Sequence, residues 1–318
     1  MIQVEHLSKY YGSHLAVEDV SFEITEGHVY GFLGPNGAGK STTMNIITGC
    51  LSATEGTVTV DGHDIFDEPK AAKACIGYLP EHPPLYLNES PQDYLQFVGE
   101  AKGLRGQALH HQIDDVVEKT GIAHVRHRRI AQLSKGYKQR VGIAQALLGN
   151  PKVIILDEPT VGLDPIQIVE IRDLIRELGR SHTVIFSSHI LSEVEAICDR
   201  IIMIAGGKLV AFGTPEELRR QLVGGSAVHL TTNAAEAEIR AILATVGGVE
   251  SITARVEGER TAAIIRAAAD TDVYQLSAAV SGALAGAGKI IYELTVEKGS
   301  LEDMFLELSG ESEKEVEA

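Results

Sequence analysis

Apolar positions along the first part of the chain fall in short strand-like runs separated by stretches of helical spacing. The segment Ser21–Thr25 alternates apolar and polar residues, which is the pattern of a strand with one buried face. Val29–Leu33 and Val153–Leu156 are continuous apolar runs, typical of strands buried on both faces. A helix-like stretch, Ile166–Gly179, leads from the second of these runs to a strand-like segment, Thr183–Phe186. This alternation predicts a doubly wound α/β domain.

The pattern becomes helical between about residues 90 and 148. Ser90 and Pro91 are residue types that favour the cap and the first position of a helix. Apolar residues recur at helical spacing after them, at Leu95, Val98, Ile113, Val116 and Val117. Because strand-like runs precede and follow this region, the pattern predicts a helical insert between two strands of a parallel core.

A second domain is predicted after the glycines of Val223–Ser226. Strand-like and helical patterns then follow one another in the order βαββαβ, over about 227–231, 234–246, 250–256, 260–267, 273–284 and 290–296. That order is typical of a ferredoxin-like unit. We therefore expect one domain over 1–224 and a small α+β domain over 226–309.

The C-terminal end carries one more helical pattern and an acidic tail. In Ser300–Leu308, four apolar residues would share one face, which favours packing in the domain core over a groove for a partner. Residues 310–318 contain four glutamates and one lysine, and we expect this acidic tail to be disordered.

Charge and cysteine content narrow the function classes. The chain has 318 residues and a net charge of −16, which argues against a nucleic-acid partner because such a surface needs a basic field. Its three cysteines are isolated, so a reducing cytoplasm is the expected setting. No secretion signal is visible at Met1–Glu5, and no apolar run reaches the roughly 20 residues that span a bilayer. If a membrane is involved, we expect a separate chain to supply the spans.

Candidate chemistry begins in a glycine-rich run after the first buried strand. Gly34–Thr42 matches the pattern G-x-x-x-x-G-K-[ST] and opens a predicted helix, which is the context that a phosphate-binding loop needs. Backbone N–H groups would turn inward around phosphate oxygens, and the helix N-terminus would add its positive dipole end. Lys40 would reach the β- and γ-phosphates, and the Ser41 hydroxyl would coordinate Mg²⁺. The expected nucleotide-binding residues here are Gly34, Pro35, Asn36, Gly37, Ala38, Gly39, Lys40, Ser41 and Thr42.

Two carboxylates follow the second buried strand. Asp157 is placed to hold Mg²⁺, and Glu158 is placed to orient or deprotonate a water. Upstream, Ser134 and Gly136 precede a predicted helix and form a further potential anion site, although a serine there is also an ordinary N-cap. Alone, each signal is weak or common, but the acidic strand end paired with the phosphate loop argues against a glycine-rich turn that binds nothing.

With these motifs in this order, residues 1 to about 220 resemble the ATP-binding cassette (ABC) ATPases. The matching residues are Tyr11 in Lys9–Gly12, Gly34–Thr42, Leu133–Gln139, Asp157–Glu158, Asp164 in Gly162–Pro165, and His189 in Phe186–His189. The resemblance implies a phosphate-loop NTPase core with an antiparallel β subdomain and a helical subdomain. It also implies a dimer in which ATP lies between the phosphate loop of one subunit and Ser134 and Gly136 of the other.

The resemblance assigns roles to three further residues. Tyr11 would stack on adenine, with Tyr10 as the competing candidate and a core aromatic as the structural alternative. Asp164 would lie in the loop that crosses the dimer interface, or is only a turn residue before Pro165. His189 would hold the γ-phosphate after the last core strand, with Glu158 as the catalytic carboxylate; a histidine alone is more often structural.

Two departures from the family pattern stand out. The signature reads Leu-Ser-Lys-Gly-Tyr where Leu-Ser-Gly-Gly-Gln is common, so Lys135 adds a cation and Tyr137 replaces an amide. Glu81 stands where the family places a glutamine that contacts Mg²⁺ and whose loop touches the membrane partner. The expected metal ligands are therefore Ser41, Asp157 and Glu81.

Together with the second domain, Glu81 and the Leu-Ser-Lys-Gly-Tyr signature make the chain resemble one bacterial branch of the family. It serves ABC-2-type permeases and includes gliding-motility and drug or antibiotic export ATPases. The branch implies an integral-membrane permease and a second ATPase subunit as partners, with the chain in the cytoplasm at the inner face of the membrane. The alternative is a soluble ABC ATPase with a non-transport regulatory role. The sequence does not indicate the substrate, the direction of transport or whether the dimer is homomeric.

Overall fold

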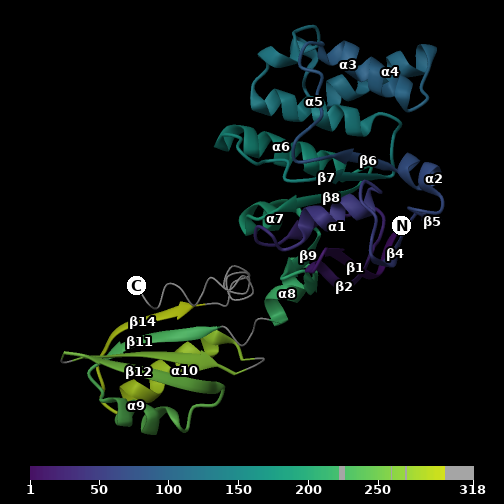
Figure 1. Cartoon of the computed structure of the whole chain (residues 1–318). Helices are drawn as coiled ribbons and strands as arrows, with labels where there is room; N and C mark the ends of the chain where they lie inside the picture. Colours follow the sequence, from purple (N-terminus) through teal and green to yellow (C-terminus); the bar gives the residue numbers. More distant parts are fainter. Residues whose placement is uncertain (222–225, 259, 269–270, 298–318) are drawn as a thin grey trace. The chain divides into compact units, whose positions relative to one another are not determined.

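The computed structural model describes residues 1–221, 226–258, 260–268 and 271–297. It divides into two compact units, Met1–Pro215 and the residues from Glu216 onward (Figure 1). The division falls at helix α8 (Pro215–Gln221), upstream of the glycines at which the sequence predicts a boundary. The predicted helix Ser300–Leu308 and the tail over 310–318 lie outside the described residues. Within the described residues, no helix has the length and apolar character that a membrane crossing requires.

The first unit begins with a four-stranded antiparallel sheet of order β2-β1-β4-β5. Its strands are β1 (Ile2–Tyr11), β2 (His14–Ile24), β4 (Glu55–Val60) and β5 (His63–Asp64). Phe22 and Ile24 are buried and Ser21 and Glu23 are exposed, so the predicted alternation is confirmed. The hairpin between β1 and β2 pairs Tyr11 with His14, which matters for the site below.

A six-stranded sheet of order β10-β9-β3-β8-β7-β6 forms the core of the unit. Its strands are β3 (Val29–Leu33), β6 (Ile76–Leu79), β7 (Val153–Leu156), β8 (Thr183–Ser188), β9 (Arg200–Ala205) and β10 (Lys208–Gly213). All neighbours are parallel except β10, which runs antiparallel to β9. Every residue of β3, β7 and β8 is buried, as continuous apolar runs predict.

One expectation about this sheet is wrong. The strand that precedes His189, β8, is not the last strand of the core, because β9 and β10 extend the sheet beyond β3. The apolar run of β9 pairs with β3, and the chain turns through Gly206 and Gly207, both at positive φ, to return as β10.

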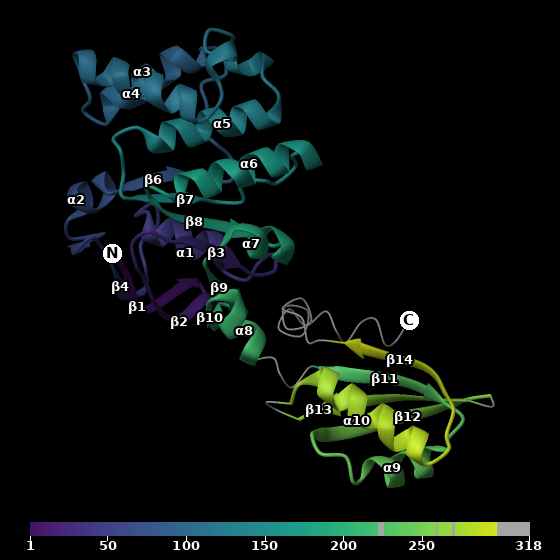
Figure 2. The ribbon, with the colours of Figure 1, turned by 180° about the vertical axis from the view of Figure 1, so that it is seen from behind.

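Helices cover the core sheet and build the predicted insert (Figures 1 and 2). The helices of the core are α1 (Lys40–Ile47), α2 (Pro69–Ala74), α6 (Pro165–Leu178) and α7 (Leu191–Ile197). The insert consists of α3 (Pro91–Ala101), α4 (Gly106–Lys119), the 3₁₀ turns η1 (Ala123–Val125) and η2 (Ile130–Gln132), and α5 (Lys135–Leu147). Ser90 caps α3 by accepting a hydrogen bond from the backbone N–H of Asp93, as predicted.

The second unit has the predicted order βαββαβ. Its elements are β11 (Ala227–Thr232), α9 (Glu236–Leu243), β12 (Val249–Glu257), β13 (Arg260–Ala267), α10 (Val273–Gly286) and β14 (Ile291–Glu297). The four strands form an antiparallel sheet of order β12-β13-β11-β14, which is the ferredoxin-like arrangement. Apolar residues of α9 and α10 pack with those of one sheet face, and Figure 2 shows α10 lying across it.

Candidate functional site

The glycine-rich run forms a tight loop between β3 and α1. Gly39 caps α1 at φ 102°, a left-handed conformation that favours glycine. A Cβ atom on Gly34 would lie 2.4 Å from the carbonyl oxygen of Ile204, so only glycine fits beside β9. The loop geometry therefore explains these two glycines of the motif.

Lys40 is the first residue of α1 and is almost completely buried. Its ammonium donates to the carbonyl oxygens of Gly34, at 2.7 Å, and Pro35, at 3.2 Å. The same group lies 3.4 Å from Oε1 of Glu158. A buried cation is thus held between the phosphate loop and the carboxylate that follows β7.

The carboxyl ends of β7 and β8 meet at one edge of the sheet because the strands are parallel neighbours. There the Ser187 hydroxyl donates to Oδ1 of Asp157 at 2.6 Å and accepts from the backbone N–H of Glu158 at 2.7 Å. The Ser41 hydroxyl donates to the same Asp157 oxygen at 3.4 Å. Glu158 itself has φ 46°, which turns the chain sharply after the strand.

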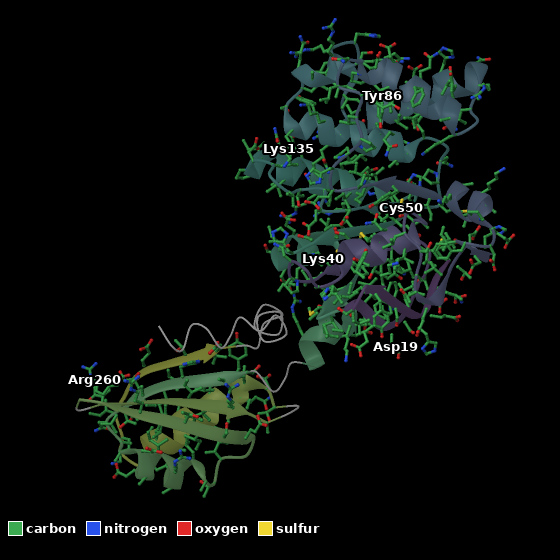
Figure 3. All side chains as sticks on the ribbon, viewed as in Figure 1. Asp19, Lys40, Cys50, Tyr86, Lys135 and Arg260 are labelled. Atoms are coloured by element: carbon green, nitrogen blue, oxygen red, sulfur yellow. The ribbon has the colours of Figure 1, made fainter. Side chains whose placement is uncertain are left out.

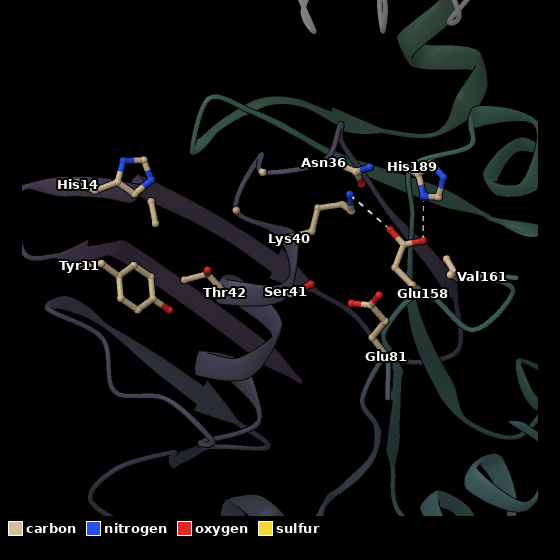
Figure 4. Close-up of a pocket in the computed structure, with 13 residues that line it drawn as sticks. Tyr11, His14, Asn36, Lys40, Ser41, Thr42, Glu81, Glu158, Val161 and His189 are labelled. Atoms are coloured by element: carbon tan, nitrogen blue, oxygen red, sulfur yellow. Dashed lines mark hydrogen bonds and ion pairs between the residues drawn. The ribbon is translucent and has the colours of Figure 1, made fainter. Parts of the chain in front are cut away.

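His189 meets Glu158 from the far side. A hydrogen bond of 3.0 Å joins Nδ1 of His189 to Oε2 of Glu158, while Lys40 lies near the other carboxylate oxygen (Figure 4). Glu158 is 8% exposed and His189 is 38% exposed. The catalytic carboxylate expected from the sequence therefore lies between a buried cation and an imidazole.

A buried carboxylate that the sequence-based reasoning missed joins the segments around Glu158 and His189. Oε2 of Glu193, on α7, accepts hydrogen bonds from the hydroxyls of Thr160, at 2.7 Å, and Ser188, at 3.0 Å. Thr160 lies two residues after Glu158, and Ser188 directly precedes His189. A glutamate at a buried position of a helical pattern is a signal that could have indicated it.

Tyr78, on β6, carries the site's clearest pKa shift. Burial, followed by the negative charge of Asp157, raises the pKa of Tyr78 well above its ordinary value. The phenol therefore stays protonated, and it donates a hydrogen bond of 3.2 Å to Oδ1 of Asn45 on α1. This contact ties the helix that follows the phosphate loop to the neighbouring strand.

These elements enclose a pocket of about 490 Å³, a size ordinary for small-molecule sites (Figure 4). The predicted site residues that line it are Tyr11, Asn36, Gly37, Gly39, Lys40, Ser41, Thr42, Glu81, Glu158 and His189. Four predicted residues do not line the pocket: Gly34, Pro35, Ala38 and Asp157. Three of these contact residues that do, since Gly34 and Pro35 accept hydrogen bonds from Lys40 and Asp157 accepts one from Ser41. His14, Ala16 and Val161 line the pocket without having been predicted.

The pocket reaches the tip of the β1–β2 hairpin. Tyr11 is half exposed there, and the Lys9 ammonium lies 5.4 Å from its ring centroid. His14, its cross-strand partner, lines the same end of the pocket. Tyr10 is half exposed as well but does not line the pocket.

Three of the predicted residues lie elsewhere. Ser134 and Gly136, at the start of α5, and Asp164, the N-cap of α6, line a different pocket together with Tyr137 and Arg140. No residue lines both pockets. Ser134 and Asp164 also cap their helices, since each accepts a hydrogen bond from a backbone N–H three residues on. Within one chain, these residues do not meet the phosphate loop.

Glu81 connects the phosphate pocket to a groove that reaches the helical insert. That groove is lined by Glu81, His82, Pro83, Leu85, Leu87, Lys135, Lys138, Gln139, Glu158 and Val161. Lys135 and Lys138, two cations of the unusual signature, thus line the same groove as Glu81. Tyr86, Leu87 and Phe97 form an apolar surface beside it, each about half exposed.

Comparisons with known proteins agree with this arrangement. The family model described as ABC transporter matches residues 17–161. The ABC transporter ATP-binding protein YhcH of Bacillus subtilis is 35% identical over 326 residues, which cover 100% of this chain and 98% of that protein. The linearmycin resistance ATP-binding protein LnrL of the same organism is 33% identical, covering 98% of each chain.

A solved structure supports the same conclusion. The dimeric bacterial ABC transporter cassette MJ0796 is 27% identical, with a TM-score of 0.62, and covers 67% of this chain and 98% of that one. A second structure of that cassette, bound to ADP and Pi after hydrolysis, has 25% identity and a TM-score of 0.61. The chain thus belongs to the ABC transporter ATP-binding proteins, the subunits that bind and hydrolyse ATP.

Proposed function

We propose that the pocket around Lys40 and Glu158 hydrolyses Mg²⁺–ATP to drive export through a separate ABC-2-type membrane permease. The observation that carries the proposal is the convergence of Lys40, Ser41, Glu158 and His189 on one pocket, although β7 and β8 carry the last two from far along the chain. A phosphate cradle beside a carboxylate that can orient water is what phosphoryl transfer requires.

The shape of the pocket suggests how the nucleotide lies in it. The β- and γ-phosphates would lie against the N–H groups of the loop, where the N-terminus of α1 favours anions. Lys40 would exchange its carbonyl contacts for phosphate oxygens. Tyr11 lies at the other end of the pocket and offers a flat, half-exposed ring for adenine, with His14 beside it.

Glu158 is the residue that we assign to the attacking water. Each of its two carboxylate oxygens has a partner: Oε1 lies near the Lys40 ammonium, and Oε2 is hydrogen-bonded to His189. Glu158 would polarise the water, and His189 would hold the γ-phosphate in line. Because charge neutralisation and positioning supply most of the catalysis in phosphoryl transfer, this arrangement is sufficient without a covalent intermediate.

Ser41, Asp157 and Glu81 are the residues that we assign to Mg²⁺. The hydroxyl of Ser41 and a carboxylate oxygen of Asp157 are already 3.4 Å apart, and Glu81 lines the same pocket. Hydroxyl and carboxylate oxygens suit Mg²⁺, which keeps several waters and takes only one or two protein carboxylates. The ion supplies positive charge to the β- and γ-phosphate oxygens when bound.

The second pocket suggests why the enzyme needs two subunits. Ser134 and Gly136 do not line the phosphate pocket of their own chain, whereas a second subunit could present its copies to the bound triphosphate. MJ0796, the similar cassette, forms a dimer. We propose the same for this chain, with a second copy or a related ATPase as its partner and Asp164 at the interface.

We place the permease contact beside Glu81. The apolar surface of Tyr86, Leu87 and Phe97 adjoins the groove that leads to Glu81, so a docked helix there could respond to the nucleotide. The chain would then work in the cytoplasm at the inner face of the membrane. The likeness to LnrL over the full length supports export of an antibiotic as the class of cargo.

Two variants test the chemistry separately. Glu158→Gln should bind ATP as the wild type does, lose turnover by roughly 100-fold or more, and accumulate as an ATP-bound dimer.

Lys40→Ala should weaken ATP binding by roughly 10- to 100-fold, because it removes a charge-assisted contact. Glu55→Gln, at an exposed position of β4, serves as the matched control. Calorimetry gives the affinity and phosphate release gives the rate.

Near-normal hydrolysis by folded Glu158→Gln would contradict the role assigned to this carboxylate. Unchanged ATP affinity in Lys40→Ala would contradict the proposal that Lys40 and its loop bind the phosphates. Co-purification of the chain with a hydrophobic membrane protein supports transport, and recovery from membranes without one would favour a regulatory role.

A further inference from the structure

The sheet face of the second unit that lies opposite α9 and α10 has an ordered pattern of side chains. The strand register aligns them in rows that cross the sheet from β12 to β14. One row consists of Arg255, Ala262, Thr231 and Glu293. The next row consists of Thr253, Ile264, His229 and Thr295. Long side chains stand at the edges of the first row and short ones at its centre.

The centre of this face suits close packing. Ala262 and Thr231 form the floor of a hollow of about 460 Å³, and Arg255 and Glu293 bound it. Ile264 also lines the hollow, with 39% of its surface exposed. Small and β-branched residues on a flat face are what a second sheet can pack against at about 10 Å.

Arginines lie toward one side of the face, Arg255 on β12 and Arg266 on β13, whereas Glu293 and Glu297 lie on the opposite edge strand, β14. Two further contacts modify this pattern, because Glu257 on β12 lines the same hollow as Arg255, and Glu297 is paired with His229 on β11. The outer strands are three strand spacings, about 14 Å, apart. Arg255 and Glu293 therefore cannot pair within one copy, and neither has an ion-pair partner within the residues that the structure describes.

A two-fold axis parallel to the strands makes this pattern complementary to itself. Such an axis lays β12 of one copy over β14 of the other and keeps the rows aligned. Arg255 of each copy then faces Glu293 of the other, and Thr253 faces Thr295. An in-plane axis perpendicular to the strands would instead lay β12 over β12 and bring the Arg255 edges of the two copies together, which is unfavourable.

We propose that this face binds the same face of a second copy of the chain, so that the second units dimerise independently of ATP. Four strands of about seven residues cover roughly 19 by 23 Å, so two faces would bury on the order of 900 Å². That is small for a stable interface. The second units would therefore associate weakly on their own, and a dimer of the ATP-binding units would strengthen the contact by raising their local concentration.

Chemical cross-linking can detect this geometry in the full-length chain. Thr253→Cys and Thr295→Cys lie on the two outer strands of one copy, about 14 Å apart, but each faces the other across the roughly 10 Å between the packed sheets of the proposed dimer, which is beyond the reach of a disulfide. With the exposed Cys50 replaced by Ser, a thiol cross-linker that spans the gap between the sheets but is too short to join the two cysteines of one copy should give a covalent dimer without nucleotide. Each single cysteine variant should stay monomeric on a denaturing gel. Efficient cross-linking by Thr253→Cys alone would overturn the proposed axis.

A charge exchange tests the recognition itself. In the double-cysteine chain, Arg255→Glu or Glu293→Arg should reduce cross-linking at least several-fold, and the two together should restore it. Arg240→Glu, on the helical face, is the matched control and should change nothing. Thermal melts must show that all variants remain folded. Equal cross-linking in single and double charge variants would overturn the proposal.

The test is independent of the ATPase assignment. In a Lys40→Ala background, where dimerisation by ATP is weakened, the cross-link should persist. If cross-linking appears only when the chain ends at Glu297, the segment beyond that residue occupies the face in the full chain, and the proposal of a second copy is wrong.

Discussion

At the scale of single residues, the site depends on how Glu158 is held. Its backbone N–H donates to Ser187, and its two carboxylate oxygens lie beside Lys40 and His189. Glu193 connects the segments that carry Glu158 and His189, because one of its carboxylate oxygens accepts hydrogen bonds from the hydroxyls of Thr160 and Ser188. We therefore infer that Glu193 positions the carboxylate and the imidazole without touching the nucleotide.

Replacing Glu193 should separate catalysis from binding. Glu193→Ala should lower kcat by roughly 10- to 100-fold while the KM for ATP changes little, since misplacing a catalytic group costs rate. Glu193→Gln keeps an oxygen that can accept both hydroxyls and should retain more activity. Ser192→Ala, exposed on the same helix, is the control. If kcat is unchanged in the folded alanine variant, or if its loss only follows a lowered melting temperature, the positioning role is wrong.

At the scale of elements, the antiparallel sheet must stay attached to the core sheet, because the β1–β2 hairpin brings Tyr11 to the pocket. One connection is an ion pair of 2.8 Å between Lys152, just before β7, and Asp61, in the turn after β4. The hydrogen bond from Lys152 lowers the pKa of Asp61 below its ordinary value. The pair joins positions 91 residues apart in the sequence.

This ion pair predicts a pH-dependent effect. Because the pKa of Asp61 is lowered by folding, its contribution to stability is present above its ordinary pKa of 3.8 and is lost as the pH falls through the lowered value. Lys152→Met should therefore slightly lower the urea midpoint at pH 7 and leave it unchanged near pH 2. Lys70→Met, exposed on α2, controls for the loss of one charge. A difference from wild type that is the same at both pH values would contradict the assignment.

At the scale of the whole molecule, the two units have separate hydrophobic cores and separate tasks. The residues that line the phosphate pocket all belong to the first unit. The second unit buries its own apolar face under α9 and α10. ATP binding should therefore be a property of the first unit, with the second unit affecting how copies associate.

A chain that ends at Gln221, after α8, tests this division. It should remain soluble and bind ATP with wild-type affinity, because no pocket residue is removed. Its association without nucleotide should be weaker than that of the full chain. Sedimentation and calorimetry measure both properties. Complete loss of ATP binding in a shortened chain with an intact first unit would show that the second unit helps to build the site.

Features that depend on residues close together in the chain could be predicted from the sequence alone. Continuous apolar runs predict β3 and β7, and apolar residues at helical spacing predict the helical insert. The βαββαβ order of such patterns predicts the ferredoxin-like unit. These predictions are possible because the residues of each strand or helix show which of its faces is buried. The family also followed from the sequence, because each motif is short and continuous. The roles assigned to individual site residues remain predictions.

The residues that lie far apart in the chain and meet at the site are known from the three-dimensional structure. It brought Glu158 and His189 to Lys40, made Glu193 a common acceptor, and added His14 to the pocket through the register of a hairpin. It also extended the core sheet with β9 and β10 and separated Ser134 from the phosphate loop. The physical reason is that strand order and side-chain convergence depend on contacts across many residues, which a local pattern does not encode.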